Sequence, residues 1–451
     1  MQESTATPHP RDRLRRELSL TDATFLVVAS VIGAGIFFAP GRVAELLPSP
    51  GWIVAAWAAG ALLSLAGALA NAELGAMFPR AGGDYVYLRE GVHPMAGFLV
   101  GWLTFFAIYA GTIAALAAAL GEGIGERFGL SEGARLGLAL AVTLAVSAIN
   151  YAGVRWGARV NNLTSVFKVT ALLAFVVLGP IVGEGDFSRL LRGVDEAGAG
   201  PSGGVSPLAF GRAMSPVLFA YLGWNASIYV ASEIRDPGRN LPRSMFVGLA
   251  ACALLYLLVN AVYLYALPMD AFRGVGDAGQ ASARALFGPV GGTLVGSFVL
   301  LSILGTLNAT VLVGPRIAYA MALDGLFFRG VDRVSELYRT PGLAIVVQAV
   351  VAGGLLILLR SFPRALDFTT FAILLASGAD MIALYRLRRI QPGRARPYRA
   401  WGYPLVPGLY LVACGGIALA LLVGSPFECL VGLGMLAAGL PFYWLFVRRG
   451  R

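Results

Sequence analysis

The sequence predicts an all-α protein that crosses a membrane twelve times as one membrane domain. Three observations lead to this fold class. First, 57% of the 451 residues are hydrophobic and only 13% are charged, a balance that a soluble core could not bury. Second, twelve apolar stretches are long enough to span about 30 Å of hydrocarbon. Third, two of these stretches contain a glycine-bearing break at corresponding positions in the two halves of the chain.

The expected spans follow one another through short connectors, none of which is long enough for a separate soluble domain. In chain order the spans are 22–47, 51–77, 94–120, 133–152, 159–182, 208–231, 244–267, 288–322, 341–359, 364–386, 404–423 and 427–447. Residues 183–207 and 268–287 are expected as connectors on the outer side, and residues 324–340 on the inner side.

The spans group as five, five and two. Residues 1–20 are expected to form a cytoplasmic tail, and residues 21–403 a transport core with an inner loop at its end. Within the core, the first five spans occupy about 21–183 and the next five about 208–386. Residues 404–451 hold the last two spans and a cytoplasmic C-terminus.

The distribution of arginine predicts the orientation. With both termini in the cytoplasm, 23 basic residues fall on the inner side and 10 on the outer side, which is the bias that the positive-inside rule expects. The net charge of +10 therefore lies in loops that face anionic lipid, and no nucleic-acid partner is expected. The single lysine among so many arginines suggests a GC-rich bacterial genome, and hence a bacterial inner membrane.

The two breaks lie in the first and sixth spans. The first reads Val31-Ile-Gly-Ala-Gly-Ile-Phe-Phe38 and the second Phe219-Ala-Tyr-Leu-Gly-Trp-Asn225. Backbone that leaves a helix within hydrocarbon exposes polar groups, each costing several kcal/mol unless it lines a wet cavity. Glycines that only let helices pack closely are the alternative. A matched pair in inverted positions favours a transporter binding site.

The directions of the broken helices predict what such a site binds. The outer half of the first span begins near Ile36, so free N–H groups and a positive dipole end point to the membrane centre, where they suit a carboxylate. The outer half of the sixth span ends near Tyr221 and leaves free carbonyls that suit an ammonium group. Together they predict a site for a zwitterion such as an α-amino acid.

Several motifs together resemble the amino acid–polyamine–organocation superfamily, and most closely its bacterial L-type amino acid transporter-like branch. They are Gly33-Ala-Gly-Ile-Phe37, Phe78-Pro-Arg-Ala-Gly-Gly-Asp-Tyr85, Phe219-Ala-Tyr-Leu-Gly-Trp-Asn225, Asp236-Pro-Gly-Arg-Asn-Leu-Pro-Arg243 and Leu304-Gly-Thr-Leu-Asn308. The resemblance implies a LeuT-type fold with a five-plus-five inverted repeat, broken first and sixth helices and two extra helices. It also implies alternating access around an amino acid site at the membrane midplane.

The resemblance assigns the substrate site to the two breaks. Amides of the first break would hold the carboxylate and carbonyls of the second the amino group, with Phe219 as an aromatic lid and Asn225 as a polar wall. The implied residues are Gly33, Ala34, Gly35, Ile36, Phe219, Ala220, Tyr221, Gly223, Trp224 and Asn225. One departure is Ala34, where many relatives carry a hydroxyl residue, and the lost hydrogen bond would be worth about 0.5–1.5 kcal/mol.

Lys168 lies in the fifth span and is the only lysine in the chain. A charge at the bilayer centre costs about 2.5–3.5 kcal/mol and marks function by default, although a stem that reaches the interface is the alternative. In sodium-independent members of the family, a lysine here stands where sodium-coupled relatives bind sodium. Its expected partners are a carbonyl near Gly33 and the hydroxyls of Ser302 and Thr306, which share a helix face.

Other charged residues within the spans have less specific expectations. Glu73 is expected to pair with loop arginines, and Arg316 to reach a network on the inner side. Asp380 has no partner that the sequence identifies.

The sequence therefore predicts a secondary active carrier of neutral or broad-range L-amino acids, independent of sodium, working as a proton symporter or as an exchanger. A polyamine or arginine exchanger is the alternative, which Asn225 disfavours because a cationic side chain usually needs a carboxylate. A membrane enzyme is disfavoured, because the only histidines are His9 and His93 and no zinc or nucleophile motif appears. A non-transporting sensor on the same fold remains open.

Few partners are expected besides the lipid bilayer and the amino acid. The sequence indicates no cofactor, metal or catalytic residue. Residues 121–132 contain no cysteine, whereas animal relatives that bind a heavy subunit carry one in this loop. No disulfide-linked heavy subunit is therefore expected.

Overall fold

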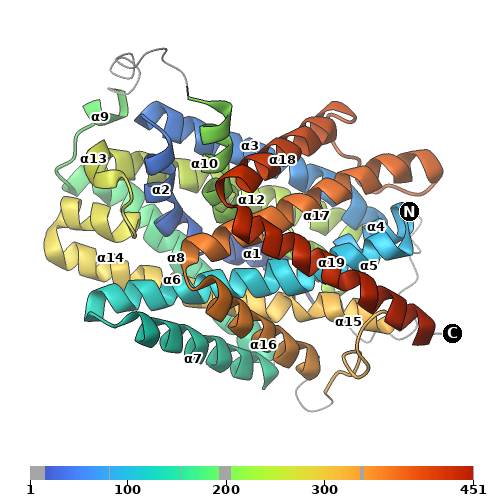
Figure 1. Cartoon of the computed structure of the whole chain (residues 1–451). Helices are drawn as coiled ribbons and strands as arrows, with labels where there is room; N and C mark the ends of the chain where they lie inside the picture. Colours follow the sequence, from blue (N-terminus) through green and yellow to red (C-terminus); the bar gives the residue numbers. More distant parts are fainter. Residues whose placement is uncertain (1–15, 81, 153, 192–204, 336–339, 450–451) are drawn as a thin grey trace.

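The computed structural model describes residues 16–80, 82–152, 154–191, 205–335 and 340–449 (Figure 1). These residues form helices and connectors, and one isolated bridge, between Leu18 and Ile234, is the only strand-like pairing among them. Most of the expected N-terminal tail, residues 1–15, lies outside the described residues.

The first half of the chain supplies ten α-helices and a π-helical segment within the third expected span. They are α1 (Leu20–Val31), α2 (Gly35–Leu46), α3 (Pro50–Met77), α4 (Asp84–Gly91), α5 (Pro94–Leu103), η1 (Thr104–Tyr109), α6 (Ala110–Phe128), α7 (Glu132–Tyr151), α8 (Val154–Val182), α9 (Ser188–Leu191) and α10 (Pro207–Ala220).

The rest of the chain continues from the second break to the C-terminus. Its elements are α11 (Ala226–Tyr229), η3 (Ala231–Glu233), α12 (Pro237–Ala266), α13 (Met269–Phe272), α14 (Ala278–Val313), α15 (Pro315–Leu323), α16 (Gly342–Leu359), α17 (Phe362–Ile390), α18 (Leu405–Gly424) and α19 (Pro426–Arg449).

The all-helical, multi-pass character that the sequence predicts is confirmed, but the number twelve is not reached. Ten helices among the described residues are long and apolar enough to cross a membrane, and the pair α1 and α2, bent by 41°, raises the number to eleven. The stretch expected at 208–231 is divided into α10, of 14 residues, and α11, of four residues. Each piece is shorter than the roughly 20 residues that a straight span needs.

Several expected connectors contain helices, among them 183–207, which holds α9 (Ser188–Leu191). Residues 268–287 form α13 and the first turns of α14, because Asp277 caps α14 by accepting from the Gln280 N–H at 2.9 Å. The expected span from 288 begins at a kink inside α14, where Gly288 has φ of 74° and Pro289 follows. The helix α4 likewise occupies the connector between the second and third expected spans.

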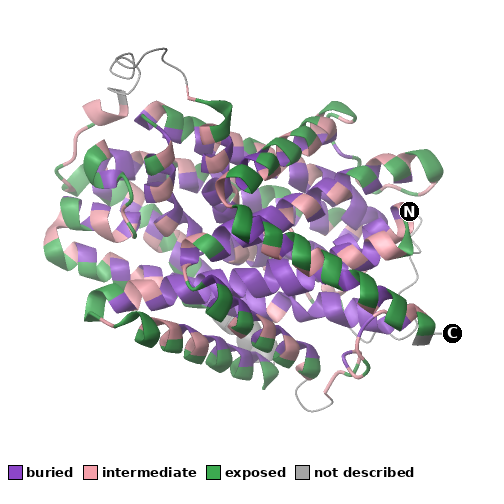
Figure 2. Cartoon of the chain, in the orientation of Figure 1, coloured by how far each residue is buried: buried purple, intermediate pink, exposed green. Residues whose placement is uncertain are grey.

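Burial separates a central helix from peripheral ones (Figure 2). The continuous helix Pro94–Phe128, made of α5, η1 and α6, is 94% buried along its apolar window, whereas Glu132–Tyr151 and Pro426–Arg448 are each only 22% buried. Exposed apolar faces on the outer helices are what a lipid-facing surface requires. The element that passes through the core is thus the third expected span.

Helix contacts define two groups of helices in the core, and α14 joins them. In one group, α1 and α3 pack against α12, and α2 packs against α10. In the other, α6 and α7 contact each other and both contact α14 and α16, while α14 also contacts α1, α2 and α12. The breaks between α1 and α2 and between α10 and α11 belong to the first group and face α6 and α14 of the second.

Candidate binding site at the two helix breaks

The first break leaves backbone donors free. The helix α1 starts with a capping box between Ser19 and Asp22 and ends at Ile32, whose ψ of 90° leaves the helical region. No described residue accepts a hydrogen bond from the N–H groups of Ala34, Gly35 or Ile36. These are the unpaired donors at the start of α2, so the positive end of that helix points into the break.

The second break leaves backbone acceptors free. The helix α10 ends at Tyr221, and the carbonyls of Ala220 and Tyr221 accept from no described donor, while the Phe219 carbonyl accepts from the Leu222 N–H at 3.1 Å. Gly223 has φ of 110°, and a Cβ there would lie 2.6 Å from the Ser30 carbonyl group. Only glycine fits this turn, because it combines a left-handed backbone with close contact to α1.

The two breaks touch each other. A Cβ on Gly35 would lie 2.3 Å from the Ala220 Cα, so the start of α2 lies directly against the end of α10. A Cβ on Gly33 would lie 2.9 Å from the Thr306 Cγ2 in α14. The free donors of one break and the free acceptors of the other therefore lie in one place, next to α14.

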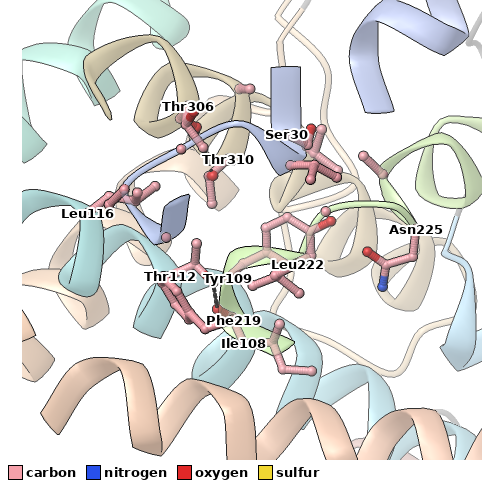
Figure 3. Close-up of a pocket in the computed structure, with 18 residues that line it drawn as sticks. Ser30, Ile108, Tyr109, Thr112, Leu116, Phe219, Leu222, Asn225, Thr306 and Thr310 are labelled. Atoms are coloured by element: carbon pink, nitrogen blue, oxygen red, sulfur yellow. Dashed lines mark hydrogen bonds between the residues drawn. The ribbon is translucent and has the colours of Figure 1, made fainter. Parts of the chain in front are cut away.

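A cavity lies between the breaks, α14 and the central helix (Figure 3). In this view Thr306 and Thr310 lie on one side of it, and Leu116 and Asn225 at its two ends. The lining residues are Ser30, Val31, Gly33, Ala34, Gly35, Ile108, Tyr109, Thr112, Leu116, Phe219, Leu222, Gly223, Asn225, Ala226, Thr306, Ala309, Thr310 and Val313. None of them is acidic, basic or histidine, so the polar groups that the cavity offers are hydroxyls, one carboxamide and backbone.

The structure brings together some of the residues that the sequence assigns to a substrate site. Six of the predicted substrate residues line the cavity, namely Gly33, Ala34, Gly35, Phe219, Gly223 and Asn225. Thr306, which is expected as a partner of Lys168, lines it as well. Ile36, Ala220, Tyr221 and Trp224 do not line it. Tyr221 instead packs between Trp57 and Tyr256 and donates to the Trp57 carbonyl at 3.2 Å.

Sequence reasoning missed the contribution of the central helix. Ile108, Tyr109, Thr112 and Leu116 line the cavity from η1 and α6. Apart from Tyr109 and Thr112 their segment is apolar, so its pattern does not separate a cavity face from a packing face. A π-helical turn is typical of functional sites, but a single sequence does not reveal one. Thr310 was detectable, since it lies one turn after Thr306 on the same face of α14.

Lys168 is buried beside the first break rather than in the cavity. Its Nζ donates to the Ile32 carbonyl at 2.8 Å and to the Thr306 Oγ1 at 2.6 Å, and its side chain is 1% exposed. The Ser302 hydroxyl, an expected partner, makes no hydrogen bond to a described residue. No described carboxylate pairs with Lys168. The lysine thus fastens the end of α1 to α14.

Two polar networks link the helices and segments next to the breaks. On one side, Asp367 in α17 accepts from Arg42 in α2 at 2.6 Å and from the hydroxyls of Ser215 in α10 and Ser425, each at 2.8 Å. Phe219 also packs edge-on against Phe362, with ring centroids 5.6 Å apart. These contacts hold α2 and α10 to α17.

On the opposite side, the chain before α1 pairs with the segment after α11. The Leu18 N–H donates to the Glu233 carbonyl at 2.8 Å, and the Arg235 N–H donates to the Leu18 carbonyl at 2.9 Å. The Glu233 side chain meets Arg316 at 3.4 Å, so this arginine has a carboxylate partner. The inner side expected for it stays a prediction.

Glu73 is fully buried within an arginine cluster. Arg388 donates to it through Nε at 3.0 Å and Nη2 at 2.5 Å, and Arg396 lies 3.2 Å away. The Ala400 N–H adds a fourth contact at 2.6 Å. The expected pairing with a loop arginine is confirmed for Arg396, whereas Arg388 belongs to the last turn of α17.

Comparisons with known proteins show which family the chain resembles. A family model described as amino acid permease matches residues 18–440. The serine/threonine exchanger SteT of Bacillus subtilis is 31% identical over 446 residues, which cover 98% of this chain and 99% of SteT. The human large neutral amino acids transporter small subunit 2 is 27% identical over 96% of this chain and 81% of the human protein. The rat b(0,+)-type amino acid transporter 1 is 28% identical, covering 96% and 88%.

Proposed function

This chain belongs to the amino acid permease family, and we propose that it is a sodium-independent secondary carrier of neutral or broad-range L-amino acids that works by alternating access. As a member of this family it is a multi-pass membrane protein that transports amino acids and not an enzyme. The proposal concerns the substrate class, the coupling and the mechanism.

The opposed polarity of the two breaks is the observation that carries the proposal. Free N–H groups of Ala34, Gly35 and Ile36 and free carbonyls of Ala220 and Tyr221 meet where Gly35 touches Ala220. A carboxylate binds at the first set and an ammonium group at the second, so an α-amino acid satisfies both ends at once. Ile36, Ala220 and Tyr221 would take part through their backbone, and Gly223 and Trp224 would hold the turn.

The uncharged lining supports a neutral side chain on the substrate. Asn225 and the hydroxyls of Thr112 and Thr310 offer hydrogen bonds but no charge. A cationic side chain would be buried without a partner, which is costly. This disfavours the polyamine or arginine exchanger. SteT, by its name, exchanges serine and threonine, and these amino acids fit a lining of hydroxyls.

The contacts of Lys168 support sodium independence. Its ammonium group lies between the Ile32 carbonyl and the Thr306 hydroxyl, oxygen ligands that a sodium ion would otherwise use. A fixed positive charge there would exclude the ion. Exchange and proton symport both remain compatible with this role, with Ser302 as part of the surrounding helix face.

The architecture that goes with this function is a five-plus-five inverted repeat of twelve spans, in which α10 and α11 together make the sixth. The core would run over residues 21–403, with α18 and α19 added after it. We further propose a cell membrane location with both termini in the cytoplasm, and no disulfide-linked heavy subunit.

Uptake of radiolabelled L-threonine, L-serine, L-leucine and L-arginine into proteoliposomes tests the proposal. We expect saturable uptake of a neutral amino acid that is unchanged when sodium is replaced by choline. Internal unlabelled amino acid should speed uptake if the carrier exchanges, and an inward proton gradient should drive it if it is a symporter. Uptake of L-arginine alone, or a requirement for sodium, would contradict the proposal.

A further inference from the structure

Two buried carboxyl groups meet beneath the second break. Asp84 begins α4 and Asp380 lies within α17, and these helices pack against each other. The two carboxyls are within hydrogen-bond reach of one another. Asp84 is 3% exposed and Asp380 is 1% exposed. Their negative charges would repel strongly at this distance if both were ionised.

The groups around the pair are neutral. Neither carboxyl has a lysine, arginine or histidine partner among the described residues. Arg316 interacts electrostatically with Tyr109, but its ion-pair partner is Glu233. The titratable side chains that face the pair are phenols, and its remaining polar neighbours are an amide and a hydroxyl: Tyr87, Tyr109, Tyr229, Tyr410, Asn71 and Thr104. No positive charge therefore compensates two carboxylates.

One oxygen of the pair is left without a partner. Oδ1 of Asp380 is buried, and no described group donates a hydrogen bond to it. A buried carboxylate oxygen without a donor is costly. A proton held between the two carboxyls cancels one of the two negative charges and gives the pair an O–H donor.

Hydrogen bonds connect this pair to the cavity. The Tyr229 hydroxyl donates to the Asp84 Oδ2 at 2.6 Å, and the Asn225 Nδ2 donates to the Tyr229 oxygen at 3.2 Å. Asn225 lines the cavity. The chain of contacts thus runs from the cavity wall through α11 to the carboxyl pair.

These hydrogen bonds link α11 to α4, while α3 contacts both α11 and α17. Asp84 and Asp380 lie on α4 and α17, which pack together with α5. Tyr229 lies on α11, which packs against α1, α3 and α12. Any movement of the second break relative to α17 therefore changes the hydrogen bond between Tyr229 and Asp84.

We propose that Asp84 and Asp380 share one proton and that transport couples to its uptake and release through Tyr229. This inference rests on the proposed function as a carrier. While Tyr229 is hydrogen-bonded to Asp84, one carboxyl of the pair carries the O–H and donates it to the other, ionised carboxyl. When α11 moves away and water enters, the O–H bond breaks, the proton passes to water and two solvated carboxylates remain. Return of the proton from the other side restores the pair.

Infrared pH-difference spectra of the purified full-length protein in lipid vesicles test the proton site without any substrate. We expect a carbonyl-stretch component of a buried carboxylic acid that is lost in both Asp84→Asn and Asp380→Asn. Asparagine is nearly isosteric with protonated aspartic acid, so both variants should fold. Asp367→Asn is the matched control on α17: its carboxylate is paired with Arg42, so it contributes no such component. If neither pair variant removes a component, the proton site is refuted.

Accumulation of L-threonine in proteoliposomes tests the coupling. With one proton per amino acid, a gradient of one pH unit supports about tenfold accumulation. We expect this in the wild type, and no gradient-driven accumulation in Asp380→Asn, which should still exchange L-threonine. Tyr229→Phe should keep the infrared component and lose the accumulation. Accumulation that persists in both variants would overturn the coupling. A wild type that takes up no amino acid would refute the carrier function and the coupling, while the infrared result would still decide the proton site.

Discussion

At the scale of single residues, the position of Lys168 is unusual because an ammonium group is buried with only neutral partners. Its Nζ contacts the Ile32 carbonyl and the Thr306 hydroxyl, and Thr306 itself lies within hydrogen-bond distance of that carbonyl at 2.7 Å. Burying a charge without a counter-ion does not favour stability. The lysine is therefore better explained by control of the first break than by folding.

We predict that Lys168→Met impairs transport without destabilising the fold. Hydrogen bonds to a charged group are worth about 1.5–3 kcal/mol. Their loss therefore changes the equilibrium constant between the fastened and the released first break by tenfold or more. Removal of the buried charge offsets the lost bonds in folding. Initial uptake of L-threonine should fall about tenfold or more, while the thermal unfolding midpoint changes little.

The neighbouring Thr306 provides the control. Thr306→Ser keeps the hydroxyl and should transport almost normally, whereas Thr306→Val removes it and should resemble Lys168→Met. Normal uptake by Lys168→Met would reduce this lysine to a packing residue.

At the scale of helices, the contact between the two breaks depends on glycine at position 35. We predict that Gly35→Ala both destabilises the protein and abolishes uptake, because the new Cβ would lie 2.3 Å from the Ala220 Cα and neither backbone can yield. Overpacking of this kind costs about 1–3 kcal/mol. Thermal unfolding of the purified protein and uptake in proteoliposomes measure the two effects.

A glycine in the middle of α7 serves as the comparison. Gly137 has no atom within 4 Å of an added Cβ, so Gly137→Ala should leave uptake intact and stabilise α7 by about 0.5–1 kcal/mol. If both alanine variants behave alike, the two breaks do not need close contact.

The second helix-scale prediction concerns the fastening of α2 and α10 to α17. Arg42 and Asp367 lie 2.6 Å apart with side chains 27% and 4% exposed, whereas Arg360 and Glu132 lie 3.9 Å apart and are 67% and 81% exposed. A double-mutant cycle to alanine should give a coupling energy of about 1–3 kcal/mol for the first pair and below about 0.5 kcal/mol for the exposed pair. Equal couplings would show that Asp367 does not organise this side of the cavity.

The helices illustrate how far the sequence can predict this protein. Hydropathy locates nearly every helix, since apolar length is a local property. The breaks were also predictable, because Gly33, Gly35 and Gly223 mark them. The roles of Tyr109 and Thr112 were not, because the facing of a helix that is apolar on all sides depends on its neighbours. The partner of Asp380 was equally hidden, since Asp84 lies about 300 residues away in the sequence and meets it only through the packing of α4 on α17.

At the scale of the whole molecule, the two polar networks lie on opposite sides of the membrane in the orientation that the basic residues predict. The Glu73 cluster with Arg388 and Arg396 lies on the side that the sequence predicts as cytoplasmic, together with the bridge between Leu18 and Ile234. The pair Arg42 and Asp367 lies on the predicted outer side. In this orientation, the Glu73 cluster and the Leu18–Ile234 bridge must open for substrate to leave into the cytoplasm. The pair Arg42 and Asp367 must open for substrate to enter from outside.

Labelling of introduced cysteines in intact bacterial cells tests this orientation. Gly133, in the first turn of α7, and Gly393, in the loop after α17, are exposed, and an added Cβ at either meets no atom within 4 Å. The native Cys252, Cys414 and Cys429 are buried, so their background should be low. We predict that a membrane-impermeant maleimide labels Gly133→Cys in intact cells and Gly393→Cys only after permeabilisation, because 23 basic residues on the inner side oppose their translocation. The reverse labelling pattern would show that the orientation is the opposite of the predicted one. Each network would then open on the other side of the membrane.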